Sequence, residues 1–166
     1  HFGVVMKRFP LRQSGFTLVE LVVVMVLLAI LAVVALPRFD AAETTAGFQA
    51  GRLARDIRHM QMLAITWSQP LKLTTAGSGY SVSCPAAGTT PPCNASPVID
   101  PASGKAFQVS LENAVTVSGG PLEVDSLGRP RSGASLAAAN TVFTLSGGSS
   151  SFSVTTAPIS GFTQVN

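Results

Sequence analysis

The stretch Gly15-Phe16-Thr17-Leu18-Val19-Glu20 opens a run of apolar residues that continues to Leu36 and contains one charged side chain, Glu20. A helix over residues 16–36 would be about 31 Å long, which matches the hydrocarbon thickness of a bilayer. A carboxylate inside such a segment is costly unless a partner neutralises it. The stretch therefore predicts a transmembrane and assembly helix over residues 16–37, whose single charge needs a partner.

Basic residues stand on the N-terminal side of this run, at Lys7, Arg8 and Arg12. The positive-inside rule predicts a cytoplasmic N-terminus and a C-terminal body on the outer side of the membrane. These three residues account for the formal net charge of +3, because residues 16–166 carry eight Lys and Arg and eight Asp and Glu. The body thus has no general electrostatic attraction for nucleic acid. Five residues precede Met6, which we expect to be the native start.

Two other kinds of N-terminal segment share some of these features. A secretory signal peptide has an apolar core of about 7–15 residues that ends at a small-residue cleavage site, whereas this run is longer and has an acidic residue near its start. A plain N-terminal membrane anchor accounts for the length of the run and the basic leader, but not for Glu20. Both remain alternatives to the interpretation that follows.

The N-terminal residues resemble the processing and assembly signal of type IV prepilins and pseudopilins. The resemblance implies that residues 1–15 are a leader, which prepilin peptidase cuts between Gly15 and Phe16, and that Phe16 becomes the N-methylated N-terminus. It also implies that Glu20 pairs with the N-terminal amine of a neighbouring subunit, so that assembly removes two intramembrane charges together. Pro37 matches a family proline that bends the helix, as the missing N–H and the ring of proline require.

The resemblance also implies partners and a location. The partners are other pilin or pseudopilin subunits, prepilin peptidase, an inner-membrane assembly platform and the lipid bilayer, whereas nucleic acid is not an expected partner. The chain would cross the bacterial inner membrane once, with a periplasmic C-terminal domain, before it enters a filament. The function expected is that of a structural minor subunit of a type IV pilus or of a type II secretion pseudopilus. A DNA-binding minor pilin for DNA uptake and an adhesive pilin subunit are the alternatives.

Beyond the membrane run, residues 38–68 predict an amphipathic continuation of the helix. An apolar stripe recurs at helical spacing, with Arg52, Arg55, Arg58 and His59 on the opposite, solvated side. Phe48 and Met62 point away from the stripe and are expected to be exposed in a lone subunit, either as scattered surface residues or as contacts for neighbours. Gln69-Pro70 should end the helix. The stripe consists of Ala46, Ala50, Leu53, Ile57, Met60, Ala64 and Trp67.

Residues 69–166 predict a β-rich globular domain. Alternating apolar and polar residues predict a hairpin of 71–74 with 79–84, a Pro-rich loop over 85–101, and further short strands. The fold class predicted is α+β and pilin-like, with one long N-terminal helix packed on an antiparallel sheet of about seven strands. The body looks most like H-type (GspH/FimT-like) minor pseudopilins and MSHA-type minor pilins, on strand order and on the turn over residues 125–130. The later strands are expected at 107–111, 115–117, 122–125, 141–145, 152–155 and 159–165.

Cys84 and Cys93 are the only cysteines, and Pro, Gly, Thr and Ala dominate the residues between them. Outside the membrane, such a pair predicts a disulfide that closes a small loop. Two reduced thiols are the alternative. A metal site is disfavoured because no second Cys/His pair completes it.

Catalysis is not predicted. His59 is the only histidine after Met6, and no phosphate-binding loop, metal-ligand cluster or nucleophile elbow appears, so neither a cofactor nor a metal is expected. Asp100, Glu123 and Asp125 are the carboxylates to consider for calcium, but they lack regular ligand spacing.

Gly128-Arg129-Pro130-Arg131 resembles a Gly-Arg-x-Arg segment with which some FimT-like minor pilins bind DNA. In those proteins it lies near the C-terminus, whereas 35 residues follow Arg131 here. Arginines in a turn are usually solvated, and contacts from only Arg129 and Arg131 would be weak at physiological salt.

Overall fold

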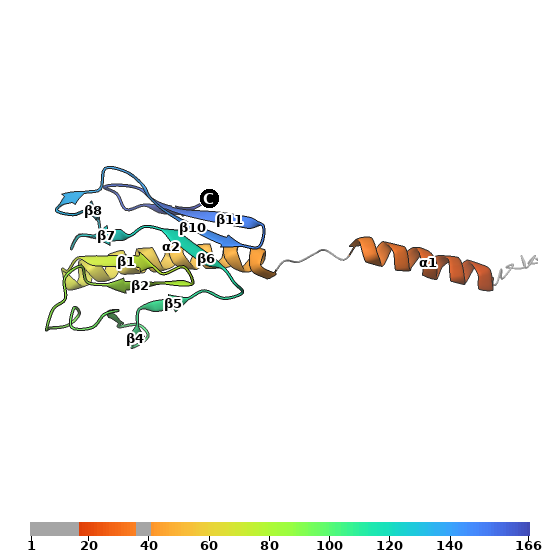
Figure 1. The fold of residues 1–166 in the computed structure, drawn as a ribbon, viewed down its shortest axis with the longest axis horizontal. Helices are drawn as coiled ribbons and strands as arrows, with labels where there is room; N and C mark the ends of the chain where they lie inside the picture. Colours follow the sequence, from red (N-terminus) through yellow and green to blue (C-terminus); the bar gives the residue numbers. More distant parts are fainter. Residues whose placement is uncertain (1–16, 36–40) are drawn as a thin grey trace, which may run out of the picture. The chain divides into compact units, whose positions relative to one another are not determined.

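The computed structural model describes residues 17–35 and 41–166, which form two helices and twelve strands (Figure 1). This confirms the predicted α+β class. The chain divides into two compact units, residues 1–38 and residues 39–166. The expected leader 1–15, Phe16 and Pro37 lie outside the described residues.

The first unit contains α1, Leu18–Ala35, and the second begins with α2, Ala41–Trp67. The strands of the second unit are β1 (Leu71–Thr75), β2 (Gly79–Ser83), β3 (Ile99–Asp100), β4 (Lys105–Ala106), β5 (Gln108–Ser110), β6 (Thr116–Gly119), β7 (Leu122–Val124), β8 (Pro130–Ser132), β9 (Ser135–Leu136), β10 (Thr141–Gly147), β11 (Ser150–Thr156) and β12 (Thr163–Val165).

The strands form two main sheets and one small ribbon, and the described pairings between strands are antiparallel. One sheet has the order β5-β2-β1-β7-β8-β9, the second has the order β12-β11-β10-β6, and β3 pairs with β4. The predicted hairpin of β1 with β2 is confirmed, with Leu73 opposite Val82. The prediction of a single sheet of about seven strands therefore underestimated the number of strands and of sheets.

The α2 helix buries the predicted stripe against both sheets. Ala46, Ala50, Leu53, Ile57, Met60 and Ala64 are fully buried, and Trp67 is partly buried. The helix contacts β10, β11 and β12 on one sheet and β1 on the other. It ends at Trp67, where Ser68 adopts a left-handed conformation (φ 51°) and the Gln69 N–H donates to the carbonyl of Ala64, as helices commonly end. Phe48 and Met62 are exposed, as predicted.

A buried tyrosine joins the helix to the first sheet. The Tyr80 hydroxyl donates a 2.6 Å hydrogen bond to Asp56 Oδ2 on α2. Burial, and then this bond to a carboxylate, raise the pKa of Tyr80. The hydroxyl therefore stays protonated and keeps donating, which satisfies a polar group inside the core.

Several strand boundaries differ from the sequence-based expectation. The expected loop over 85–101 contains β3 at its end, and the expected last strand 159–165 is reduced to β12. The short β8 and β9 were not predicted, because proline and glycine in residues 128–133 favoured a loop. The backbone hydrogen bonds of β8 come from its pairing with β7, and those of β9 from its pairing with β8, which the local sequence does not predict.

Candidate assembly site

The N-terminus of α1 is capped by a local hydrogen bond. The Glu20 backbone N–H donates to Thr17 Oγ1 at 3.2 Å. Thr17 and Glu20 have the spacing of a capping box, in which a threonine at the N-cap is followed three residues later by glutamate. This role for Thr17 was missed in the sequence, although the Thr-x-x-Glu spacing was visible. Glu20 is thus in the first turn of α1, where a negative charge suits the helix dipole.

Apolar side chains surround α1. The described side chains of residues 17–32 are all exposed, with Leu18 at 80% and Val19 at 70%. Burial of one Leu or Val side chain stabilises a protein by about 1.5–3 kcal/mol. Because α1 leaves a dozen large apolar side chains exposed, it gains none of this stabilisation in water. Within its own unit, α1 therefore leaves its apolar side chains without cover.

In the described part of the chain, none of the helices is both long and apolar enough to be assigned as a membrane span. The expected segment 16–37 extends beyond the described α1 at both ends.

The loop between β7 and β8 is organised by Asp125. Its Oδ1 accepts hydrogen bonds from the backbone N–H groups of Leu127 and Arg129, both at 2.9 Å. Its Oδ2 accepts one from Arg129 Nε at 2.9 Å and forms an ion pair with the second guanidinium nitrogen at 2.7 Å. Burial alone would raise the pKa of Asp125, but the bonds from Arg129 and Leu127 outweigh it and hold the pKa below its ordinary value. Asp125 is therefore a turn-forming carboxylate.

The second arginine of the candidate DNA segment is also paired. Arg131 lies opposite Glu123 in the β7–β8 pairing, and its Nε is 2.8 Å from Glu123 Oε1. Arg131 Nε has no hydrogen-bond partner among the described residues, so this contact is an ion pair. Phosphate contacts by Arg129 or Arg131 would compete with Asp125 and Glu123, and the geometry therefore does not favour DNA binding here.

Replacement of Asp125 by asparagine is expected to lower the melting temperature by about 4–8 °C at pH 7, because the loss of bonds to a charged acceptor costs about 1–3 kcal/mol. Since the pKa of Asp125 is lowered by folding, its contribution is full above the unfolded value of about 3.9 and is lost as pH falls below it. The melting temperatures of the two proteins should therefore converge toward pH 2. Glu112→Gln, an exposed carboxylate, is the control; a difference that is independent of pH would contradict the assignment.

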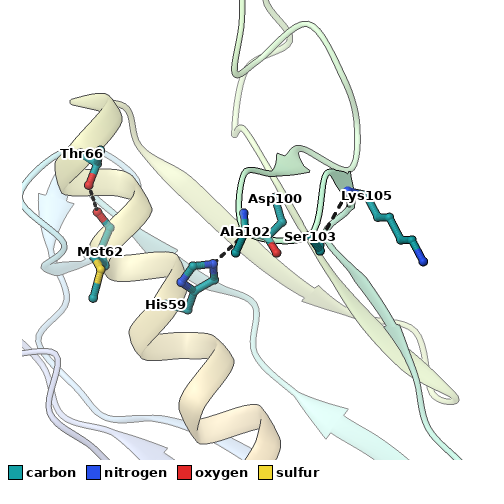
Figure 2. Close-up of polar contacts among 7 residues, drawn as sticks. All are labelled: His59, Met62, Thr66, Asp100, Ala102, Ser103 and Lys105. Atoms are coloured by element: carbon teal, nitrogen blue, oxygen red, sulfur yellow. Dashed lines mark hydrogen bonds and ion pairs between the residues drawn. The ribbon is translucent and has the colours of Figure 1, made fainter.

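His59 is not free on a solvated helix side, as the sequence suggested. Its Nε2 lies 2.9 Å from Asp100 Oδ1, and its ring packs near Phe107 at 5.7 Å between centroids. Figure 2 shows the imidazole on α2 and the carboxylate of β3 facing one another. Asp100 Oδ1 also accepts from the Ala102 N–H. The pair ties the β3–β4 ribbon to α2, and the helical pattern did not reveal it because Asp100 is 41 residues away.

The predicted disulfide between Cys84 and Cys93 is present. Within residues 17–35 and 41–166, no cluster of three or more His, Cys, Asp and Glu is arranged to hold a metal ion. The three carboxylates considered for calcium lie next to cationic or potentially cationic side chains, with Asp100 next to His59, Glu123 next to Arg131 and Asp125 next to Arg129.

Comparison with known families gives a match for the N-terminal segment. Residues 10–36 match the family model of the prokaryotic N-terminal methylation motif. No curated protein and no solved structure matches the chain. The motif indicates a substrate of prepilin peptidase of the type IV pilin or pseudopilin class. Proteins of this class are structural subunits that assemble with other pilins.

Proposed function

We propose that this chain is a minor structural subunit of a type IV pilus or of a type II secretion pseudopilus. Prepilin peptidase cuts it between Gly15 and Phe16, and Phe16 is then N-methylated. The observation that carries the proposal is the methylation motif over residues 10–36, which contains the apolar helix α1. The exposed apolar side chains of α1 support assembly by helix–helix packing, because they need a cover that their own unit does not provide.

The membrane role rests on residues 16–36, a longer segment than the described helix. Before assembly this segment holds the subunit in the bacterial inner membrane, with the folded domain in the periplasm. In the filament, the Glu20 carboxylate pairs with the methylated amine of a neighbouring Phe16. Each group is costly in hydrocarbon alone, so the pair favours the assembled state. In the folded domain, α2 supplies the amphipathic helix that is expected over residues 38–68.

The mass of the mature N-terminus tests this proposal. Membranes from bacteria with prepilin peptidase should yield a chain that begins at methylated Phe16, and membranes without the peptidase should yield the uncut chain. Gly15→Ala should remain uncut in both, because the small glycine allows close approach of the backbone to the enzyme. Gln13→Ala, within the leader and downstream of Met6, is the control and should be cut normally. An uncut wild-type chain, or a cut beyond Pro37, would overturn the proposal.

A purely structural subunit and a DNA receptor differ in their response to salt. A receptor would bind DNA in a salt-sensitive manner that is lost when Arg129 and Arg131 are replaced. The ion pairs of both arginines favour the structural role.

The subfamily resemblance, to H-type minor pseudopilins or MSHA-type minor pilins, supports a minor subunit.

A further inference from the structure

A hollow lies at the C-terminal end of α2, beside the disulfide loop. It has a volume of about 360 Å³ and is lined by Trp67, Pro91, Pro92, Asn94 and Ile99. Two smaller hollows of about 240 and 140 Å³ adjoin it, because they share Pro91 and Pro92 in one case and Asn94 in the other. The three hollows together surround the loop closed by Cys84 and Cys93.

The described residues that line these hollows carry no ionisable side chain. Charged ligands, such as nucleic acid, anionic lipid headgroups and acidic peptides, would find no counter-charge there. Several walls are nevertheless polar. The side chains of Trp67, Gln69, Thr90, Asn94 and Ser96 can donate or accept hydrogen bonds, and within the described part of the chain none of them has a hydrogen-bond partner. A purely apolar ligand would cover these groups and leave them unsatisfied.

The hollow is held in shape by contacts from both sides. The disulfide closes the loop, and the Gly88 N–H donates to the Cys93 carbonyl within it. Ile99 stands beside the buried Val98, whose N–H donates to the Val82 carbonyl. Asp100 is held to α2 by His59, as Figure 2 shows. A site of fixed shape binds with a smaller loss of conformational entropy.

We propose that this hollow is a binding site for a neutral saccharide. A sugar ring has C–H groups on its face, which stack on the electron-rich face of an indole such as Trp67, and hydroxyl groups on its edge, which suit Asn94 and Gln69. A proline-rich peptide fits less well, since such peptides dock on grooves lined by several aromatic rings. Trp67 is the single tryptophan of the chain, and the single tyrosine, Tyr80, is buried in the core. The site belongs to the folded domain, so the inference does not depend on how the N-terminus is processed.

Because Trp67 is the only tryptophan, its fluorescence reports directly on the site. The full chain, in a detergent without a sugar headgroup, is titrated with methyl glycosides of glucose, mannose, galactose and N-acetylglucosamine and with their disaccharides. At least one probe should shift Trp67 emission in a saturable manner, unaffected by 0.5 M salt. Asn94→Ala should weaken that binding about tenfold, the effect of losing one or two hydrogen bonds. Trp67→Ala should abolish the heat of binding measured by calorimetry.

Asn140→Ala is the matched control, because Asn140 is also an exposed loop asparagine and lies outside these hollows. It should bind the probe as the wild type does. Asn94 is exposed and without partners, so Asn94→Ala should melt at the wild-type temperature, and the test does not depend on whether Trp67→Ala folds. The proposal is overturned if no saccharide shifts the emission, if Asn94→Ala binds as tightly as the wild type, or if decaproline binds at Trp67 while the saccharides do not.

Discussion

Glu20→Gln is expected to leave cleavage and methylation at Phe16 intact and to reduce incorporation into filaments by at least about 100-fold. Glutamine keeps the size of the side chain and can still serve in the Thr17 capping box, so α1 retains its N-terminal cap. It removes only the negative charge. Under the proposed function, a neighbour's amine would then be buried in hydrocarbon without a counter-charge, a change that costs about 3–5 kcal/mol, or a factor of 100 or more.

The measurement is the ratio of filament-bound to membrane-bound subunit, with the N-terminal mass determined for both fractions. Thr17→Ala separates the two roles of this turn. It removes the cap but keeps the charge, so it should cost only about 1 kcal/mol of helix stability and should still assemble. Equal incorporation of Glu20→Gln and wild type would remove the pairing role from Glu20. Failure of Glu20→Gln to be cut would instead assign Glu20 to recognition by the peptidase.

Gly147→Ala should destabilise the folded domain by about 3 kcal/mol and lower its melting temperature by about 10 °C. Gly147 ends β10 where the sheet meets the first turns of α2. A Cβ at this position would lie 3.0 Å from the Cβ of Ala46 and too close to the backbone carbonyl of Ala42. Backbone atoms in a helix cannot move aside alone, so α2 would have to shift away from β10 and β11. Such a shift would loosen the contact through which Ala46 and Ala50 are buried.

Gly51→Ala is the matched control for this prediction. Gly51 lies in α2, where an added Cβ would meet only the guanidinium of Arg55, at 3.6 Å. Alanine is a better helix former than glycine by about 1 kcal/mol, so this variant should melt slightly above the wild type. Thermal unfolding followed by circular dichroism compares the three proteins. If Gly147→Ala melted together with the wild type, the close approach of α2 to β10 would be wrong.

The prediction from sequence succeeded where a structural feature depends on residues that are close in the chain. The burial of Ala46 through Ala64 along α2 follows from a helical repeat, and the β1–β2 hairpin follows from alternation on both sides of a short turn. The disulfide between Cys84 and Cys93 closes a short loop and could be expected from spacing. The methylation motif is likewise a continuous stretch, matched over residues 10–36.

The features that failed or went unseen depend on residues brought together by folding. Asp100 reaches His59 across 41 residues, and Thr163 accepts from Arg58 across 105 residues. Glu123 and Arg131 meet only because β8 pairs with β7. The division into two sheets and the hollow beside Trp67 arise in the same way.

By itself, the sequence indicated a pilin or pseudopilin type of peptidase substrate and predicted the α+β composition, because a helix repeat, an apolar length and a processing motif are properties of neighbouring residues. Only the tertiary structure decided which polar groups have partners. A side chain's electrostatic state depends on which charge lies within a few ångströms of it, and no pattern along the chain records that distance. The arginines of the β7–β8 loop are therefore paired, whereas the Asn94 side chain beside Trp67 has no hydrogen-bond partner within the described part of the chain.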